Sequence, residues 1–591
     1  MACQSRDAKL ERAFRLAGEN RGELEKVLQH YSRQKADSLK LRAARFLIGN
    51  MPGHCTLICP ELEAIRQDST RSYFERKVWD ICAGNYSDIR SISERREDVQ
   101  YLTSDFLIRH IDASFALLEK YPWNRDLPFE LFLEYLLPYR LEYEEVDFWR
   151  DSFRIHPGAL ADLNSNDDLK YDVWRAGRVF KFEQQPEFSG RPLELFGERR
   201  FPDCRDLYLR KEFEYRALGV TGVLDFLPCY PNRNGYHYWS YILSPFRKQT
   251  AINGAPNSKA AKVYRRTFSR QLELKPAKGE RIPDLFANPF NKDVTATYFH
   301  TADVTINIRE KLQGNQRYAY LCVFNNLVWQ PIAIGEVKGK KVRFEDMGKD
   351  LAYLPVYYQG TQRRDLDYPF ILRMNGRQDK LIPDTTKLIH LHLIRKYPYG
   401  ERVFFDHFFD EVYMEASETA DFQRADTVFN IRMGDNHYMD LSLSSEKKYR
   451  YWRVAHPRAV ANIAEFMFWD RNGQSVRGET EGSGNRCLDM DPLTAIDYGT
   501  KELVLDFGEP IAFSRVVCLP RSDGNGIYAG DEYELMYYGR NGWVSLGSKI
   551  ATDFFIDFSD VPSGALYWLR NLSGGVEERI FTFENGEIRF W

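Results

Sequence analysis

The stretch FPDCRDLYLRKEFEYRALGVTGVLDFLPCYPNRNGYHYWSYIL, residues 201–243, determines how the central part of this chain is expected to fold. Leu209, Phe213 and Ala217 recur every four residues and Gly219 follows them, which predicts a helix that ends at the glycine. The apolar run after it predicts a strand, the Pro/Asn/Gly-rich segment a turn, and the aromatic run a second strand. The predicted order is therefore helix, strand, turn and strand.

Cys204 lies in the first turn of the predicted helix. Asp203 and Asp206 have the spacing of a capping residue and its reciprocal partner, which sets the start of the helix at this point. Unpaired N–H groups and the helix dipole at this end favour the thiolate, the reactive form of a cysteine, whereas the two aspartates oppose it. Cys204 is therefore the candidate nucleophile.

The second predicted strand supplies a candidate base. Because side chains alternate along a strand, His237 and Trp239 share one face. This strand is expected to pair with the strand that follows the cysteine helix, so His237 can accept the thiol proton. Asn253 lies where the next strand would end, and its amide could hold the imidazole in the accepting tautomer. The alternative is that the cysteine and the histidine are ordinary core residues.

A series of short motifs resembles the transglutaminase-like superfamily: Asp-Cys204-x-Asp, Arg-Ala-Leu-Gly-Val, Asp-Phe-Leu-Pro, Asn-Arg-x-Gly and His237-x-Trp, in this order. The resemblance implies a papain-like core with Cys204 as nucleophile, His237 as base and Asn253 at the third position. An acid usually occupies that position, although papain-like proteases use asparagine. A second departure is Tyr236, where the family often has glycine. Tyr236 and Trp239 would line the cleft.

Upstream segments extend this resemblance over residues 121–270. Bacterial proteins with such a domain often carry a Leu-Pro-Tyr-Arg140 segment, which we interpret as the end of an aromatic helix, stopped by Pro138, that packs on the core. Papain-like enzymes place an oxyanion-hole glutamine before the nucleophile, and Gln184 or Gln185 lies at a suitable distance, with Gln185 the chosen candidate.

Length and charge narrow the class of protein. A chain of 591 residues is too long for one core and should form roughly three to five domains. The net charge of −3 provides no basic field, so nucleic acid is not an expected partner. Aromatic residues make up 15% of the chain, which fits both β-sandwich cores and sugar-binding surfaces.

The nine cysteines are scattered and odd in number, so they predict no disulfide framework. Cys55 and Cys59 beside His54, with Cys82 downstream, could form a zinc site, but buried or free thiols are the simpler interpretation, and no metal ligand is assigned. The start Met-Ala-Cys3-Gln-Ser resembles the mature end of a bacterial lipoprotein. An exported protein of the cell envelope, anchored only by lipid on Cys3, is expected; an ordinary cytosolic start is the alternative.

The regions on either side of the central domain differ in their predicted secondary structure. Residues 1–120 show the apolar stripe of helices, with a breaker at Asn50-Met-Pro-Gly53. Residues 271–440 contain short β segments, including Val294 to Ile308, which predict one or two antiparallel sandwiches. No apolar run is long enough to span a membrane.

The C-terminal region, 441–591, carries a second resemblance. The segments Tyr449-Arg-Tyr-Trp-Arg-Val, Asn462-Ile-Ala-Glu-Phe-Met-Phe, Asp491-Pro-Leu-Thr, Leu503-Val-Leu-Asp-Phe-Gly, Gly530-Asp-Glu-Tyr-Glu-Leu and Trp543-Val-Ser-Leu-Gly resemble a coagulation-factor-5/8 type C, or discoidin, domain. The resemblance implies a galactose-binding-like jelly-roll sandwich that binds glycans through its loops. Its Asp-Pro-Leu-Thr turn often neighbours a structural calcium, for which Asp489 or Asp491 would supply oxygen ligands; a polar turn is the alternative.

Together these features predict a multidomain α+β protein. It has a helical N-terminal region, a papain-like transglutaminase-fold core, a β-sandwich middle and a C-terminal discoidin-like sandwich. The expected activity is cysteine-dependent acyl transfer, most simply the hydrolysis of an amide in a peptide or glycopeptide, with no cofactor required. Peptide:N-glycanase-like cleavage is a narrower version. The alternative is a non-catalytic glycan-binding or scaffold protein with a degenerate cleft.

Overall fold

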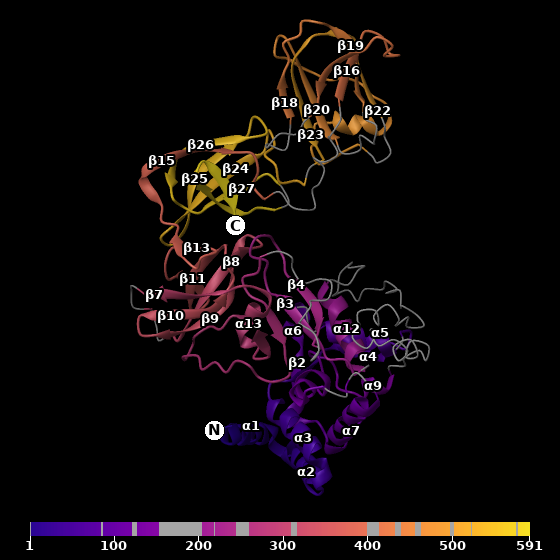
Figure 1. The fold of residues 1–591 in the computed structure, drawn as a ribbon, viewed down its shortest axis with the longest axis vertical. Coiled ribbons are helices and arrows are strands. Elements are labelled where there is room, and N and C mark those ends of the chain that lie inside the picture. Colours follow the sequence, from indigo (N-terminus) through magenta and orange to yellow (C-terminus); the bar gives the residue numbers. More distant parts are fainter. Residues whose placement is uncertain are drawn as a thin grey trace.

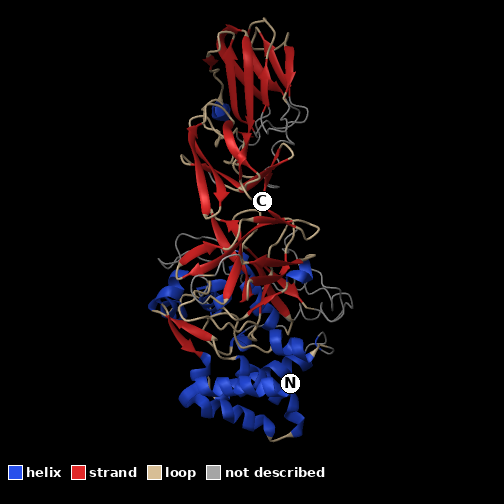
Figure 2. Ribbon diagram, turned by 90° about the vertical axis from the view of Figure 1, so that its left-hand side faces the viewer, coloured by secondary structure: helices blue, strands red, loops and turns tan. Residues whose placement is uncertain are grey.

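The computed structural model describes most of the chain and shows an elongated arrangement of several units. The described residues are 2–71, 73–83, 87–120, 124, 127–152, 204–217, 219–243, 259–308, 312, 316–398, 413–431, 439–455, 463–496, 502–521, 523–574 and 577–591. Helices of the N-terminal region form one end and a β-sandwich forms the other, while the C-terminus lies between them (Figures 1 and 2).

The N-terminal region is helical, as predicted. Its helices are α1 (Ala2–Ala17), α2 (Arg21–Ser32), α3 (Ser38–Asn50), α4 (Pro60–Gln67), α5 (Tyr73–Ala83), α6 (Ser87–Ile92) and α7 (Ser104–Lys120). Leu24 and Val27 of α2 pack in one core with Leu47 and Ile48 of α3, because residues three and four apart share a helix face. The predicted breaker is confirmed, since α3 ends at Asn50.

A small sheet lies within this region, although the sequence predicts only helices there. Strands β1 (Cys55–Ile58) and β2 (Glu94–Glu97) pair antiparallel, with Cys55 opposite Glu97. Gly53 just before β1 has φ +95°, a value that side-chain-bearing residues rarely adopt, so the chain can turn sharply from α3 into β1. Four residues are too few to show an alternating pattern, which explains the missed strands.

The central unit contains a four-stranded antiparallel sheet in the order β4-β3-β5-β6, covered by one long helix. Its elements are α12 (Cys204–Ala217), β3 (Gly222–Leu227), β4 (His237–Ile242), β5 (Tyr264–Arg266) and β6 (Asn291–Asp293), with the short helices α8 (Phe129–Leu131), α9 (Trp149–Ser152), α13 (Asp284–Ala287) and α14 (Thr295–Tyr298) and a π-helix at Phe132–Leu136 around them. The helix, strand, turn and strand predicted from the sequence are confirmed. The start of α12 at Cys204 is confirmed as well.

A single eight-stranded antiparallel sheet follows, in the order β14-β13-β11-β8-β9-β10-β7 with β12 paired to β11. The strands are β7 (Ala302–Asn307), β8 (Tyr318–Asn325), β9 (Val328–Lys338), β10 (Lys341–Met347), β11 (Leu351–Gln359), β12 (Gln362–Asp365), β13 (Phe370–Leu372) and β14 (Gln378–Lys380). The predicted β segment from Val294 to Ile308 is wrong in its first half, where α14 lies. The Asp293 side chain accepts hydrogen bonds from the Thr295 N–H at 2.9 Å and from the Thr295 hydroxyl at 2.6 Å, which favours a turn at this point.

Residues 413–520 form two four-stranded antiparallel sheets packed face to face. One sheet contains β16 (Tyr413–Ser417), β17 (Asp426–Asn430), β19 (Tyr449–Ala455) and β22 (Glu502–Ile511), and the other β18 (Met439–Ser442), β20 (Ile463–Asp470), β21 (Ser475–Val476) and β23 (Phe513–Pro520). Trp452 and Leu505 from the first sheet meet Phe466 and Phe468 from the second in one core. The predicted domain boundary between 440 and 441 lies within β18 of this sandwich.

The last unit combines strands from two distant parts of the sequence. A five-stranded sheet in the order β25-β24-β27-β28-β29 shares a core with the pair β15-β26. The strands are β15 (Asp384–Leu393), β24 (Glu532–Gly539), β25 (Gly542–Ile550), β26 (Ile556–Ser563), β27 (Tyr567–Asn571), β28 (Ile580–Glu584) and β29 (Glu587–Phe590). The six segments that resemble a discoidin domain are therefore divided between two units, four in the sandwich region and two in this sheet.

Aromatic rings join this last sheet to the eight-stranded sheet. Phe324 of β8 lies 5.2 Å from Trp568 of β27, and Trp329 of β9 lies 5.8 Å from Tyr538 of β24, as ring centroids. Arg373 also pairs with Glu584 at 3.0 Å across the same junction. Buried aromatic contacts are energetically large, so these two units are expected to move as one.

Among the described residues, no helix combines the length and the apolar character needed to cross a bilayer.

Candidate functional site

The candidate nucleophile occupies the first position of α12. Cys204 begins this helix, and Gly219 just beyond its end has φ +67°, which supplies the left-handed turn that stops it. Leu209 and Phe213 of α12 are buried against Leu224 of β3, as the four-residue repeat predicts. The N-terminal end of α12 thus has a fixed position relative to the sheet.

Strands β3 and β4 return the chain to this end of α12. β3 follows the C-terminal end of the helix and ends at Leu227, and His237 begins β4 directly opposite Leu227. A helix of 14 residues and a strand of six are both about 20 Å long, so one pass along β3 leads back towards the start of the helix. Cys204 and His237 therefore lie at the same end of the unit.

Neighbouring side chains show how close the two positions are. The guanidinium carbon of Arg205 lies 5.2 Å from the ring centroid of Tyr238, so the residues that follow Cys204 and His237 are in contact. Tyr208, one helical turn after Cys204, packs against the cluster that contains Trp239. The first turn of α12 therefore reaches the start of β4.

His237 lies on the face of β4 that points away from most of α12. Tyr238 shares a core with the helix residues Leu209 and Phe213, whereas Trp239 belongs to a separate cluster with Leu227. The alternation expected from the sequence is thus confirmed. His237 is the first residue of its strand, so it lies at the end of the sheet that is closest to the N-terminal end of α12.

Aromatic rings and a polar network surround His237 on this face. Its imidazole lies between the rings of Tyr230 at 6.1 Å and Trp239 at 5.7 Å, both nearly parallel to it. Trp239 is fully buried and donates from Nε1 to the Tyr298 hydroxyl at 3.1 Å. The Tyr298 hydroxyl donates in turn to Asp225 at 2.5 Å. The indole beside His237 is therefore held in one orientation.

Asp225 completes this network within the sheet. It is fully buried and accepts two hydrogen bonds from Arg265 of β5, at 2.7 and 2.8 Å. The paired geometry satisfies a carboxylate that would otherwise be costly to bury. A charged residue in the apolar strand Val-Leu-Asp-Phe-Leu was the sequence signal for such a partner, but the sequence does not identify Arg265.

Of the other predicted site residues, the structure describes Tyr236 but not Asn253 or Gln185. Tyr236, directly before His237, is 43% exposed and its ring lies 5.8 Å from that of Tyr238. Asn253 and Gln185, like the alternative Gln184, lie outside the described residues. The structure therefore describes the place of Cys204 in α12 and the side chain of His237, while the third and oxyanion positions stay predictions.

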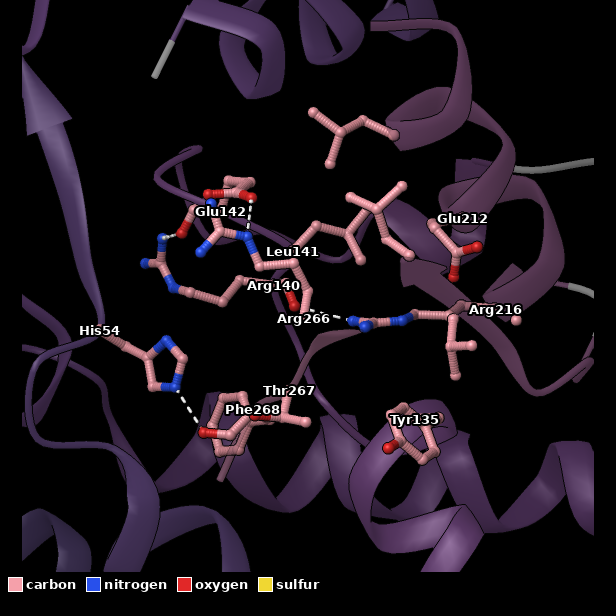
Figure 3. A pocket seen from close by; sticks show the side chains of 14 residues that line it. His54, Tyr135, Arg140, Leu141, Glu142, Glu212, Arg216, Arg266, Thr267 and Phe268 are labelled. Atoms are coloured by element: carbon pink, nitrogen blue, oxygen red, sulfur yellow. Dashed lines mark hydrogen bonds and ion pairs between the residues drawn. The ribbon is translucent and has the colours of Figure 1, made fainter. Parts of the chain in front are cut away.

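A buried acid lies on α12 two turns beyond Cys204. Glu212 is 1% exposed, and the Ser240 hydroxyl and the Arg216 guanidinium are its polar neighbours. Burial raises the pKa of Glu212 to about 8. A cavity of about 20 Å³, enough for one water molecule, lies beside it and is also lined by Arg216, Tyr135 and His54 (Figure 3). The cavity is too small for a substrate, so we interpret it as a hydration site.

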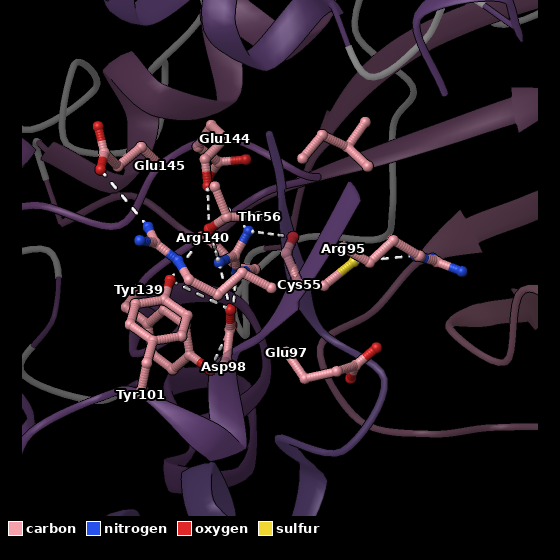
Figure 4. A network of polar contacts seen from close by, with 12 residues as sticks. Cys55, Thr56, Arg95, Glu97, Asp98, Tyr101, Tyr139, Arg140, Glu144 and Glu145 are labelled. Atoms are coloured by element: carbon pink, nitrogen blue, oxygen red, sulfur yellow. Dashed lines mark hydrogen bonds and ion pairs between the residues drawn. The ribbon is translucent and has the colours of Figure 1, made fainter. Parts of the chain in front are cut away.

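The predicted Leu-Pro-Tyr-Arg140 segment anchors the N-terminal region to this unit. Arg140 is buried and binds the Asp98 carboxylate through Nε at 2.6 Å and Nη2 at 2.5 Å (Figure 4). Its own carbonyl accepts a hydrogen bond from Arg216 of α12 at 2.8 Å. The helical segment before Pro138 packs mainly on the N-terminal helices, with Tyr135 reaching Val223 of β3. It therefore bridges both units.

The zinc alternative near Cys55 is not supported by the side chains present. His54 donates a hydrogen bond from Nε2 to the Phe268 carbonyl at 2.9 Å, and its ring is stacked between Phe268 and Phe290. Burial lowers the pKa of His54 to about 3. Arg95 donates to the Cys55 sulfur at 3.3 Å. The imidazole and this thiol therefore have separate partners.

Two carboxyl groups, one from β20 and one from the loop that contains the Asp-Pro-Leu-Thr turn, lie next to each other at the predicted calcium site. Glu465 of β20 is fully buried, and its carboxyl group lies against the Asp489 side chain and the backbone N–H groups of Met490 and Asp491. Burial and the adjacent Asp489 carboxylate raise the pKa of Glu465 to about 9. Asp489 accepts a hydrogen bond from the Thr494 hydroxyl at 2.8 Å. Glu465 was not among the predicted calcium ligands, although an acid inside the apolar run Ile463-Ala-Glu-Phe-Met-Phe indicates a buried carboxyl group.

Comparison with known proteins finds no family model that matches this chain and no curated protein with significant similarity to it. The chain is a multidomain protein with a helical N-terminal region and several antiparallel sheets. Its central unit brings a cysteine at a helix start and a histidine at a strand start to the same end of a sheet.

Proposed function

We propose that the central unit is a cysteine-dependent acyl-transfer enzyme of transglutaminase-like type. Cys204 is the nucleophile, His237 is its base, and Asn253 orients the imidazole. The substrate is an amide of a peptide or glycopeptide, and water is the usual acceptor. In the same proposal, the β-sandwich units hold the enzyme close to a glycan-bearing substrate and raise its effective concentration.

The chemistry follows the usual course of a thiol hydrolase. His237 takes the thiol proton, and the thiolate forms a bond to the carbonyl carbon of the amide. The C–N bond then breaks, and the imidazolium gives its proton to the leaving amine. Water, deprotonated by His237, attacks the thioester and releases the carboxylic acid together with the free thiol. No electrons are gained or lost, so no cofactor is required.

The contact between Arg205 and Tyr238 is the observation that carries the proposal. These residues directly follow Cys204 and His237, and the 5.2 Å between the Arg205 guanidinium and the Tyr238 ring supports a short separation between the start of α12 and the start of β4. The guanidinium beside the start of α12 adds positive charge to that of the helix end, and both favour a thiolate.

A generic acyl donor tests this chemistry without knowledge of the natural substrate. We expect p-nitrophenyl acetate to release one equivalent of nitrophenolate in a burst and to leave an acetyl group on the Cys204 peptide, as read by mass spectrometry. Cys204→Ala should lose the burst. Cys229 is an internal control, since burial raises its pKa to about 12 and keeps it a thiol. Acetylation of several cysteines at equal, slow rates would refute the proposal.

A non-catalytic glycan-binding protein is the rival function. The observation in its favour is Tyr236, whose ring is 43% exposed immediately before the proposed base and could obstruct a cleft. Tyr236→Gly separates the two functions: acetylation of Cys204 should persist or increase if the cleft is catalytic. A protein that shows no acetylation with either residue at this position would fit the rival.

We also propose a structural calcium ion in the sandwich. The residues present fit such an ion, because the buried Glu465 carboxyl group lies against the exposed Asp489 carboxyl group, and a hard cation would stabilise both as carboxylates. Glu465 and Asp489 would hold it, together with carbonyl oxygens of the same loop, such as that of Arg486. Within the described residues, no three side chains of His, Cys, Asp and Glu form a metal group, so main-chain oxygens would be needed.

Thermal unfolding with calcium or a chelator tests this ion. We expect calcium to raise the unfolding temperature of the sandwich, and to do so more strongly at higher pH, because Glu465 must lose its proton to bind. Glu465→Gln should abolish the effect. Asp491→Asn is the matched control, since the Asp491 side chain accepts from the Leu493 N–H within its own turn at 3.0 Å. An equal calcium response in Glu465→Gln would overturn the assignment.

A further inference from the structure

The loop between β3 and β4, residues 228–236, leads directly into His237 and determines where that residue stands. The loop contains Gly235 at φ +89°, and the Tyr230 N–H donates to the Gly235 carbonyl at 3.0 Å. Much of the remaining polar backbone of this loop is bound by residues that lie far away in the sequence. Its shape therefore depends on other units of the molecule.

Asn325, at the end of β8, supplies the largest set of these contacts. The two N–H groups of its side-chain amide are shared among three carbonyls of the loop, those of Tyr230 at 2.9 Å, Arg233 at 3.0 Å and Gly235 at 2.9 Å from Nδ2. Its Oδ1 accepts from the Gly235 N–H at 3.3 Å. Asn325 is 2% exposed, so water does not readily replace these bonds. One side chain thus binds both ends of the turn.

Two residues from the last unit hold the same loop from the other side. Arg579, just before β28, is fully buried and donates to the carbonyl of Pro231 in the loop and to that of Phe324 in β8. The Tyr397 hydroxyl, beyond β15, accepts from the Asn234 N–H at 3.3 Å. Arg579 also donates to the Trp591 carbonyl. A buried guanidinium that binds carbonyls fixes their relative positions closely.

We propose that Asn325 and Arg579 are positioning residues for His237. They hold the β3–β4 loop against the eight-stranded sheet and the last sheet, so these units, and not β3 and β4 alone, set the place of the imidazole. This inference rests on the proposed function, in which His237 is the base for Cys204. In this proposal, the junction between the central unit and the C-terminal sheets supports catalysis because it holds His237 in place.

Asn325→Asp is the most direct perturbation. The side chain keeps its size but loses the N–H groups and turns a carboxylate towards three carbonyl oxygens. We expect amide exchange in residues 230–236 to accelerate about tenfold or more, and the His237-dependent labelling of Cys204 by iodoacetamide at low pH to fall to the level of His237→Ala. Arg579→Lys should have the same effects more weakly, because lysine keeps the charge but presents fewer donors.

Asn20→Asp is the matched control. Asn20 also binds two carbonyls through its amide, those of Val99 at 3.1 Å and Leu102 at 3.0 Å, but it does so in the N-terminal helical region. The same chemical change there should destabilise the protein to a similar degree. Neither the exchange of the β3–β4 loop nor the pH profile of Cys204 labelling should change, which separates positioning from general loss of stability.

Two readouts separate the failure of the inference from the failure of the proposed function. If Cys204 labelling is the same in the unmodified protein and in His237→Ala, the proposed function fails. Amide hydrogen exchange of the β3–β4 loop in Asn325→Asp then tests whether the junction holds the loop. If labelling depends on His237 but stays intact in Asn325→Asp, the inference is overturned, whether or not the loop exchanges faster. Should Asn325→Asp not fold, Arg579→Lys provides the same two readouts.

Discussion

The Glu212 carboxyl should make the central unit less stable as the pH rises. It is buried on α12, and burial outweighs the Arg216 guanidinium and the Ser240 hydroxyl, which favour its charged form. Glu212→Gln replaces the ionisable group with a neutral amide of nearly the same shape. The variant therefore changes the pH dependence of stability while it leaves the packing of the helix close to what it was.

The magnitude follows from the two pKa values. In the unfolded chain the carboxyl ionises near pH 4.5, whereas burial raises the pKa of folded Glu212 to about 8. Between these values the folded state holds the extra proton, so a rise in pH favours unfolding. Each pKa unit corresponds to about 1.4 kcal/mol, which gives a loss of about 5 kcal/mol at most, absent below pH 4.5 and complete above about pH 8.

Urea unfolding at pH 5 and pH 8 measures this effect, with pulse proteolysis reporting the peptides of α12 and β3. We expect Glu212→Gln to be more stable at pH 8, relative to the unmodified protein, than it is at pH 5, by several kcal/mol. The amide itself adds a constant offset that cancels in this comparison. A difference in unfolding free energy that does not vary with pH would refute the argument.

Two further substitutions test the packing around the site. Gly222→Ala should cost about 1–3 kcal/mol, because its Cβ would lie 2.6 Å from the Tyr215 ring and 2.9 Å from Glu212; an unchanged urea midpoint would contradict this. Asp98→Ala should cost about 3–5 kcal/mol, since it leaves the buried Arg140 unpaired. Arg140→Met in the Asp98→Ala background should recover part of that loss, and no recovery in thermal unfolding would argue against the ion pair as the cause.

Local patterns predict the elements that carry the candidate site. The four-residue spacing of Leu209 and Phe213 gives the buried face of α12, and alternation gives the face of β4 on which His237 lies. Cap and stop signals also place Cys204 at the helix start. These features depend on residues within one or two turns of each other, which is why the sequence reveals them.

Contacts between distant segments are not encoded in such patterns. Asn325 lies 95 positions from Tyr230, and Arg579 lies 348 positions from Pro231, so no periodicity links them. The pairing of β15 with β26 is similarly remote and crosses the predicted domain boundaries. A one-residue change in sheet register would move every side chain to the other face, so these pairings depend on the whole fold.

Iodoacetamide labelling of Cys204 across pH, in the unmodified protein and in His237→Ala, tests the central claim most directly. The proposal predicts that labelling titrates well below the free-thiol pKa of about 8.5, and that this low-pH reactivity disappears in His237→Ala. That result would demonstrate a thiolate stabilised by the imidazolium. Labelling that titrates at about 8.5 or above in both proteins would contradict the claim and leave Cys204 an ordinary thiol.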